Sequence, residues 1–423
     1  MRYNWLMSKM TITGPTSLKG EWQTAGAKNS VLPLLAATLL CDGPVELTNV
    51  PELSDVEVMC QILEELGVVI ERHDHRLVVN AAQARPGHIP HHLTAKMRAS
   101  VLVLGPAVGR LGEISIAQPG GDIIGARPIA SHLTAFERLG LTVEHAVGVT
   151  KVSGRPVGTR VVLGELTVTG AENAIMAACL AQGTTELRMV ALEPHVVDLC
   201  EMLVAFGAKI EGIGKNVLQI TGVESLHGGT WRVIPDHLES GTIAIAAAAT
   251  HGDVVIHDFL IEEHDAFLTI FDDIGVQYEI LSPTSVHIRP GGTYNAVHIR
   301  TQPYPNFPSD LQAPMAVLLS QANGTSEIFE TMYEGRLHYL FELQRMGATV
   351  ATRDAHTGMI TGPTPLFGTD LVSFDIRAGA TILLAGMVAE GQTVIDRIEH
   401  IDRGYERIDE RLRAIGADII RHD

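Results

Sequence analysis

One lysine stands where a ligand could be bound, in a glycine-containing phrase that precedes an apolar run. Residues 25–30 read AGAKNS and lead directly into the helix-like run 31–40, so that Lys28 falls at the expected helix start. The free N–H groups of a helix start, together with the charge of a lysine, favour an anion. An exposed lysine at an ordinary helix start is the other interpretation of this phrase.

A second candidate is the segment 118–128, which reads QPGGDIIGARP. Its three glycines lie between Pro119 and Pro128, a composition typical of a mobile loop that closes over a ligand. The segment carries both an acid, Asp122, and a cation, Arg127. The alternative is a plain connection in which Asp122 caps a turn.

Three further arginines lie in compact phrases: Arg98 in MRAS (97–100), Arg377 in DIRA (375–378) and Arg403 in HIDRGYER (400–407). Because arginine forms paired hydrogen bonds with carboxylate and phosphate, a group of arginines would imply an anionic substrate. Each arginine alone could equally be half of a structural ion pair.

Asp310 is the candidate for a base. It follows Pro305 and Pro308 in the phrase PNFPSDLQ (305–312). The position suits either a fixed carboxylate that accepts a proton or the cap of a helix.

The elements that must position these residues repeat six times along the chain. The repeated phrase is an apolar residue and a glycine after an amphipathic stretch, followed by an alternating apolar run; its glycines are Gly67, Gly140, Gly207, Gly275, Gly347 and Gly416. A second series follows Ala/Leu-rich stretches and precedes another strand-like run: Gly43, Gly112, Gly183, Gly252, Gly324 and Gly391. Each repeat of about seventy residues therefore predicts helix, turn, strand, helix, turn and strand, with the first-series glycine in a left-handed helix end. The fold class predicted is α/β.

Length and composition bound the remaining possibilities. A chain of 423 residues favours two domains, and six repeats divide as three and three. The formal net charge of −18 disfavours binding to nucleic acid or anionic lipid. No run approaches the roughly 20 apolar residues that span a bilayer, and the N-terminus has no long apolar signal core.

The residue types that bind metals show no ligand spacing. Pro90 separates His88 from His92, which spoils the helix that would align them. The four cysteines, Cys41, Cys60, Cys179 and Cys200, are scattered in or beside apolar helix-like segments. We therefore expect no metal site, and buried thiols of a cytosolic protein.

Together these phrases resemble the UDP-N-acetylglucosamine enolpyruvyl transferases, the MurA family, over nearly the whole chain. The resemblance rests on five ordered matches: GAKN (26–29), MRAS (97–100), PGG with IGARP (119–121 and 124–128), FPSD (307–310) and HIDRGYER (400–407). It implies two inside-out α/β barrel domains, each of three repeated units with helices inside and sheets outside. One domain would span 28–235 and the other 1–27 with 236–423, and the active site would lie in the cleft between them.

The reaction of the family moves the enolpyruvyl group of phosphoenolpyruvate onto the 3-hydroxyl of the sugar and releases phosphate, in the first committed step of peptidoglycan synthesis. The resemblance implies Asp310 as the base and Asp122 as the acid that protonates the methylene carbon. The residues it assigns to phosphoenolpyruvate and its charge are Lys28, Arg98, Arg127, Arg377 and Arg403. Those it assigns to the sugar or its nucleotide are Asn29, Pro128, Ile129, Ala130, Ser131, Thr169, Gly170, Met332 and Arg336, the last two from MYEGR (332–336).

Two departures from the family pattern bear on function. Most members have Cys where this chain has Asp122, and fosfomycin inactivates them by alkylating that Cys, so resistance is expected here. In the nucleotide region, Ala130 stands where the family usually has Asp. The Ser-Val-Gly-Ala run of many members is replaced by VTGA (168–171). A paralogue that acts on another nucleotide or nucleotide sugar is therefore an alternative, as are a shikimate-type transferase and a noncatalytic binding protein of this fold.

The expected partners are phosphoenolpyruvate and a UDP-sugar. We expect no cofactor, no nucleic acid and no membrane, and a cytoplasmic monomer.

Overall fold

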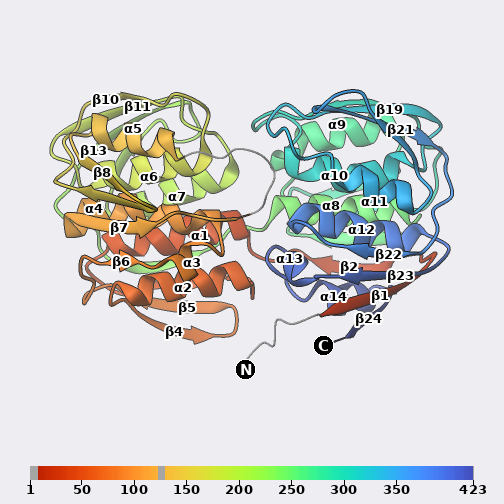
Figure 1. The fold of residues 1–423 in the computed structure, drawn as a ribbon, viewed down its shortest axis with the longest axis horizontal. Helices are drawn as coiled ribbons and strands as arrows, with labels where there is room; N and C mark the ends of the chain where they lie inside the picture. Colours follow the sequence, from red (N-terminus) through yellow and green to blue (C-terminus); the bar gives the residue numbers. More distant parts are fainter. Residues whose placement is uncertain (1–7, 122–128, 423) are drawn as a thin grey trace. The chain divides into compact units, whose positions relative to one another are not determined.

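Two compact units make up the part of the chain that the computed structural model describes, residues 8–121 and 129–422. Unit 2 comprises residues 26–121 and 129–234, and unit 1 comprises residues 8–25 and 235–422. Each unit has its own hydrophobic core: one formed between Val31 and Val233, the other from Met10 to Trp22 and Leu238 to Ile419. Figure 1 follows the chain through both units.

Six four-stranded sheets, three in each unit, share one topology. In the sheet formed by residues 88–153, the first strand pairs parallel with the second, and the second and third each pair antiparallel with the fourth. The other sheets have the same pattern of pairing, although some take one strand from a distant part of the chain. The sheets of unit 2 are β14(Gly229–Arg232)-β3(Val45–Thr48)-β5(Arg76–Asn80)-β4(Val69–His73), β6(His88–Ile89)-β7(Glu113–Ala117)-β9(Val149–Ser153)-β8(Thr142–Ala146) and β10(Arg160–Val162)-β11(Thr184–Arg188)-β13(Val217–Thr221)-β12(Lys209–Glu211). Those of unit 1 are β2(Lys19–Gln23)-β15(Asp253–His257)-β17(Ser285–Ile288)-β16(Tyr278–Ser282), β18(His298–Arg300)-β19(Gly324–Phe329)-β21(Thr357–Gly362)-β20(Thr349–Thr352) and β22(Asp370–Val372)-β23(Gly391–Asp396)-β1(Lys9–Gly14)-β24(Asp418–His422).

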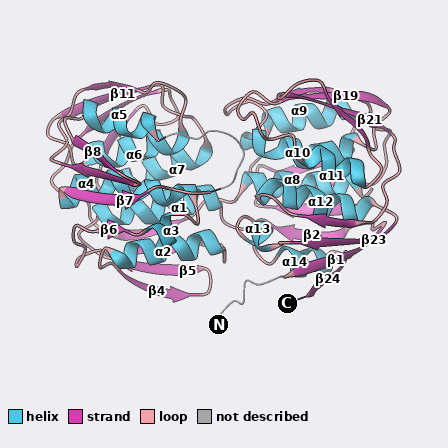
Figure 2. Ribbon diagram, viewed as in Figure 1, coloured by secondary structure: helices cyan, strands magenta, loops and turns pink. Residues whose placement is uncertain are grey.

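The helices lie inside each unit and the sheets outside, as Figure 2 shows in cyan and magenta. Unit 2 contains α1(Lys28–Ala37), α2(Ser54–Glu65), α3(His91–Thr94), α4(Leu104–Leu111), α5(Ala130–Arg138), α6(Val168–Cys179) and α7(Pro194–Ala205), with 3₁₀ turns η1(Thr38–Leu40) and η2(Arg98–Val103). Unit 1 contains α8(His237–Ala249), α9(Asp265–Ile274), α10(Ser309–Leu319), α11(Tyr339–Arg345), α12(Ile376–Val388), α13(Glu399–Asp402) and α14(Ile408–Ala414), with 3₁₀ turn η3(Ile261–Glu263). The predicted α/β class with inside-out barrels is confirmed.

Composition explains which helices occupy the centre of a unit. In α8, α10 and α12, which pack on one another, almost every residue is buried. A helix that is apolar on all sides must be surrounded by protein. The strands instead alternate: in β3, Val45 and Leu47 are buried while Glu46 and Thr48 are partly exposed, so one face covers the helices and the other meets water.

The glycine series has the predicted conformation. Gly67, Gly140, Gly207, Gly275, Gly347 and Gly416 all have positive φ, between 79° and 107°. Glycine adopts this left-handed conformation at least cost because it has no Cβ. The repeat holds more strands than predicted, since each sheet adds an entry strand such as β14 and a hairpin partner such as β5.

The predicted burial of the thiols is also confirmed: all four cysteines are free and buried. None of the helices described here is long and apolar enough to cross a bilayer.

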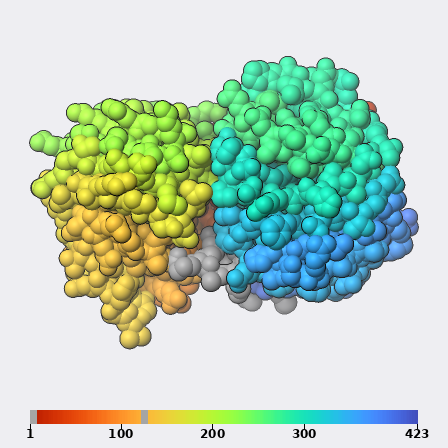
Figure 3. Space-filling model, turned by 90° about the horizontal axis from the view of Figure 1, so that it is seen from above, coloured from red at the N-terminus to blue at the C-terminus, as the bar shows by residue number. Residues whose placement is uncertain are grey.

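The two units differ in which parts of the sequence form them. The described residues of unit 2 all lie between residues 26 and 234, and its face in the space-filling view of Figure 3 runs from orange to yellow-green. Unit 1 combines the N-terminal strands β1 and β2 with residues 235–422.

Candidate active site

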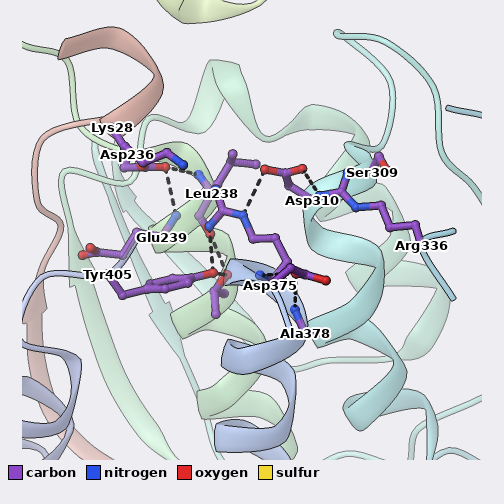
Figure 4. Close-up of polar contacts among 12 residues, drawn as sticks. Lys28, Asp236, Leu238, Glu239, Ser309, Asp310, Arg336, Asp375, Ala378 and Tyr405 are labelled. Atoms are coloured by element: carbon purple, nitrogen blue, oxygen red, sulfur yellow. Dashed lines mark hydrogen bonds and ion pairs between the residues drawn. The ribbon is translucent and has the colours of Figure 1, made fainter. Parts of the chain in front are cut away.

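Asp310 lies between two buried arginines of unit 1. Arg336 Nη2 donates to Asp310 Oδ1 at 2.5 Å, and Arg377 Nε donates to Asp310 Oδ2 at 3.0 Å. The side chains of Arg336 and Arg377 are only 9% and 5% exposed, whereas that of Asp310 is 26% exposed. Figure 4 shows the two contacts that hold the carboxylate. Its exposed fraction means that it still meets solvent.

This arrangement decides one of the two interpretations of Asp310. Helix α10 begins at Ser309, its N-cap residue is Pro308, and no side chain caps it. Asp310 lies inside the first turn, so the cap interpretation is wrong. A carboxylate in the first turn is also favoured by the helix dipole.

The two arginines remain charged despite their burial. Burial alone would lower the pKa of Arg336, but Asp310 and Tyr333 raise it, with a net upward shift. Burial would likewise lower the pKa of Arg377, and Tyr405 and Asp310 outweigh that effect. Two permanent positive charges therefore flank the carboxylate.

Glu330, which the sequence analysis did not single out, helps to fix Arg336 through Ser309. It is fully buried at the end of β19 and accepts from Ser309 Oγ at 2.6 Å. Ser309 Oγ in turn accepts from Arg336 Nη1 at 2.8 Å. The other oxygen of Glu330 accepts from the backbone N–H of Met332 at 2.7 Å and of Tyr333 at 3.2 Å. One carboxylate thus joins the arginine beside Asp310 to the segment that carries Met332.

Arg377 is fixed from a second direction. Its Nη1 donates to Tyr405 Oη at 2.8 Å, and Tyr405 Oη is 3.0 Å from Thr242 Oγ1 on α8. Asp375 caps α12, accepting from the backbone N–H of Arg377 and of Ala378 at 2.8 Å each. The arginine therefore has a fixed backbone and a fixed guanidinium.

His237 adds a titratable ring to this part of unit 1. It is the first residue of α8, capped by Asp236. Burial and the charge of Arg377 lower the pKa of His237, Asp310 opposes them, and the net result is a pKa of about 4. The ring is therefore neutral at neutral pH.

Arg403 follows α13 directly, as its C-cap residue. Its neighbour Asp402 forms a paired contact with Arg421, 3.0 Å from Oδ1 to Nη1 and shorter at the second pair. This ion pair attaches α13 to β24 and so fixes the backbone on which Arg403 is carried.

In unit 2, helix α1 begins at Lys28, as predicted, with Asn29 next to it. Lys28 Nζ lies 3.7 Å from Asp55 Oδ2 at the start of α2, and both side chains are largely buried. The cation is therefore partly compensated by the protein in this structure.

The first turn of α1 is anchored through Asp198 of α7. Asp198 accepts a short hydrogen bond from Ser30 Oγ and one from Trp231 Nε1 at 2.8 Å. Burial raises the pKa of Asp198, while Ser30, Trp231 and the backbone N–H of Ile234 act to lower it. This buried carboxylate fixes Ser30, two residues after Lys28.

Arg98 opens η2 and lines a surface hollow of unit 2. The same hollow is lined by Gln118, Pro119, Ile129, His145, Ala146, Gly148, Val149 and Thr150. Asp122, Arg127 and Pro128 lie outside the described residues.

The described residues of the predicted nucleotide region lie at the starts of two helices. Ile129 is the N-cap residue of α5, whose first residues are Ala130 and Ser131. Thr169 and Gly170 lie in the first turn of α6, where Thr167 Oγ1 accepts from the Gly170 N–H at 3.3 Å. Helices α5 and α6 pack together, so these segments belong to one part of unit 2.

Asp310, Arg336 and Arg377 are thus brought together, from positions 67 residues apart at most. Glu330, Tyr405, Asp55 and Asp198 were not singled out. Asp198 is a charged residue among apolar neighbours, VVDLC (196–200), and that isolation could have drawn attention to it. The other three lie among polar residues and carry no such local signal.

Comparison with known proteins places the chain among its relatives. The sequence matches the EPSP synthase (3-phosphoshikimate 1-carboxyvinyltransferase) family over residues 12–412. Proteins named UDP-N-acetylglucosamine 1-carboxyvinyltransferase are similar at 44% identity in Magnetococcus marinus and 42% in Salmonella arizonae, over 98% of this chain and 99% of each relative. The chain belongs to this family of carboxyvinyl (enolpyruvyl) transferases. It is therefore an enzyme of that class.

Solved structures agree with the fold of this enolpyruvyl transferase. The enolpyruvyl transferase NikO from Streptomyces tendae superimposes with a TM-score of 0.88 at 26% identity, over 98% of this chain and 99% of NikO. An EPSP synthase from Acinetobacter baumannii superimposes with a TM-score of 0.76 at 18% identity, over 99% of this chain and 100% of the synthase, a similarity of fold alone.

Proposed function

We propose that this protein transfers the enolpyruvyl group of phosphoenolpyruvate to the 3-hydroxyl of UDP-N-acetylglucosamine, releasing phosphate, in the first committed step of peptidoglycan synthesis. The observation that carries the proposal is the identity of 42–44%, over nearly the full chain, with proteins named for this reaction. A shikimate-type activity is not favoured, because the EPSP synthase structure compared is only 18% identical.

The proposed base is Asp310, which takes the proton of the sugar hydroxyl. Its geometry supports this role: the carboxylate is fixed by two arginines and remains partly exposed. Preorganisation of this kind lowers the cost of reaching the reactive arrangement. Met332 and Arg336 would border the sugar, and Asn29 would bind the sugar or the intermediate.

The proposed cations for phosphoenolpyruvate are Lys28, Arg98, Arg127, Arg377 and Arg403. Their charges would offset the phosphate and carboxylate of the substrate and the charge that develops during transfer. Burial of Arg377 supports this assignment, since a charge interacts more strongly where water is excluded. Asp122 would protonate the methylene carbon, and no cofactor or metal is invoked.

The nucleotide of the acceptor would be bound by Pro128, Ile129, Ala130, Ser131, Thr169 and Gly170. We further propose a cytoplasmic monomer that acts on small molecules and needs no nucleic acid or membrane. The free, buried thiols support a reducing compartment.

The first expected result is phosphate release only when phosphoenolpyruvate and UDP-N-acetylglucosamine are both present. The measurement is a colorimetric phosphate assay on the purified, folded protein, with a panel of other nucleotide sugars beside it. Release with a different nucleotide sugar alone would establish the paralogue. No release with any acceptor would establish the binding protein.

A second expected result concerns Asp122. A carboxylate is a poorer nucleophile toward an epoxide than a thiolate, so the unaltered protein should resist time-dependent inactivation by fosfomycin. Asp122→Cys should become sensitive and keep its activity. Mass spectrometry of the treated proteins tests this: an adduct on Asp122 of the unaltered protein would refute the expectation.

A further inference from the structure

The start of α6 carries a hydroxyl whose hydrogen-bond direction is set by buried residues. Thr169 Oγ1 lies 3.2 Å from His132 Nε2, and His132 Nδ1 lies 2.9 Å from Asn173 Nδ2. His132 and Asn173 are 1% and 0% exposed, whereas Thr169 is partly exposed. A chain of contacts thus leads from the core of unit 2 to a side chain at its surface.

The amide of Asn173 can adopt only one orientation. The backbone N–H of Gly105, which can only donate, points at Asn173 Oδ1 at 2.7 Å. The carbonyl oxygen of Val101, which can only accept, faces Asn173 Nδ2 at 2.9 Å. Both neighbours require the same orientation, with the NH₂ group toward His132.

The orientation of Asn173 determines the tautomer of His132. Because Asn173 Nδ2 donates, His132 Nδ1 must accept, and the ring proton must be on Nε2. Burial and, to a smaller extent, the charge of Arg98 lower the pKa of His132 to about 3, so the ring stays neutral at neutral pH. Nε2–H therefore donates to Thr169 Oγ1.

The hydroxyl of Thr169 is left as a donor. A hydroxyl has one hydrogen and two lone pairs, and His132 occupies one lone pair. The hydrogen of Thr169 must point away from His132, and the described residues offer it no acceptor. A ligand with an acceptor oxygen at this place would be recognised by a donor fixed in advance.

We infer that Thr169 donates a hydrogen bond to an oxygen of the nucleotide on the acceptor substrate, and that His132 and Asn173 are positioning residues which fix its direction. The inference rests on the proposed function, which places the nucleotide at the starts of α5 and α6. The oxygen belongs either to the pyrimidine base or to a phosphate. Both are acceptors, and the hydroxyl serves either in the same way.

The test compares Thr169→Val, which keeps the shape and removes the hydroxyl, with Thr169→Ser, which keeps the hydroxyl. Calorimetry with UDP should show Thr169→Val binding about three- to tenfold more weakly if the oxygen is neutral, and more than about tenfold if it is a phosphate oxygen. Thr169→Ser should stay within about twofold of the unaltered protein. Uridine separates the two sources, because a loss that persists with uridine assigns the oxygen to the nucleoside.

The outcomes separate this inference from the proposed function. If the unaltered protein binds UDP and Thr169→Val binds it equally well, the inference is wrong and the proposed function stands. If the unaltered protein binds no uridine nucleotide, both are wrong. The KM for phosphoenolpyruvate should not change in Thr169→Val. An equal rise in the KM for phosphoenolpyruvate and in the KM for the UDP-sugar would indicate a general structural defect instead.

The tautomer can be measured independently of any ligand. In ¹⁵N-histidine NMR, the signal that disappears in His132→Gln should have the Nε2–H pattern, unchanged from about pH 5 to pH 8. An Nδ1–H pattern would reverse the contacts and overturn the assignment of Thr169 as a donor.

Discussion

Asp310→Asn should lower turnover by about a hundredfold to ten-thousandfold, because it removes the proposed base and changes little volume. The amide can still accept from one of the two arginines that now hold the carboxylate at 2.5 and 3.0 Å. Binding of the UDP-sugar should therefore change only a few-fold. The measurements are steady-state phosphate release and calorimetry on the same preparation.

The matched control is Asp409→Asn. Asp409 is a buried carboxylate that, like Asp310, pairs with two arginines, 3.1 Å from Arg413 and 3.3 Å from Arg421, but it has no proposed role in the reaction. It should lose stability and keep turnover within about threefold. A turnover of Asp310→Asn above about one third of normal would exclude the base role.

Arg411→Met should destabilise unit 1 by about 3 kcal/mol, because it leaves a buried carboxylate without its counter-charge. Glu239, only 3% exposed, accepts from Arg411 at 2.7 and 3.1 Å, from Trp22 Nε1 at 3.0 Å and from the backbone N–H of Ala25 at 3.1 Å. Arg411 also stacks over the ring of Trp22, 4.1 Å from its centre. The loss should appear as a lower urea midpoint for unit 1.

Arg289→Met gives the comparison for an exposed pair. Arg289 and Glu279 lie across the β16–β17 hairpin and are 52% and 48% exposed. Removing an exposed partner should cost less than about 1 kcal/mol, since water screens the pair. Equal losses in the two variants would show that the burial of Glu239 does not matter.

Much of the fold could be predicted from periodicity. The glycines of the first series terminate helices in a left-handed conformation because that requirement is local and leaves a mark at each position. Lys28 likewise begins α1 where the Gly-Ala phrase precedes an apolar run. The entry strands were missed because they are short and pair with segments far along the chain, as β14 does with β3.

The residues of the candidate site were predicted, but the contacts between them were not. Asp310, Arg336 and Arg377 were each singled out, yet nothing near Asp310 in the sequence distinguishes a capping aspartate from one held by arginines 26 and 67 residues away. Glu330 and Asp198 act through contacts that exist only after folding. Pairing of this kind depends on tertiary packing, which local sequence does not encode.

Strand β1 pairs with β23 and β24, which are synthesised much later, and this has a consequence for biosynthesis. Lys9 pairs with His422, so the sheet that contains β1 cannot close until residue 422 has been synthesised. The described residues of unit 2 end at residue 234, so this unit can fold as soon as residue 234 has left the ribosome. Strands β1 and β2 emerge first and must wait for their partners, with their edges open to other chains. Strand β2 is covered once β15 has been made, whereas β1 stays open until β23 and β24 follow.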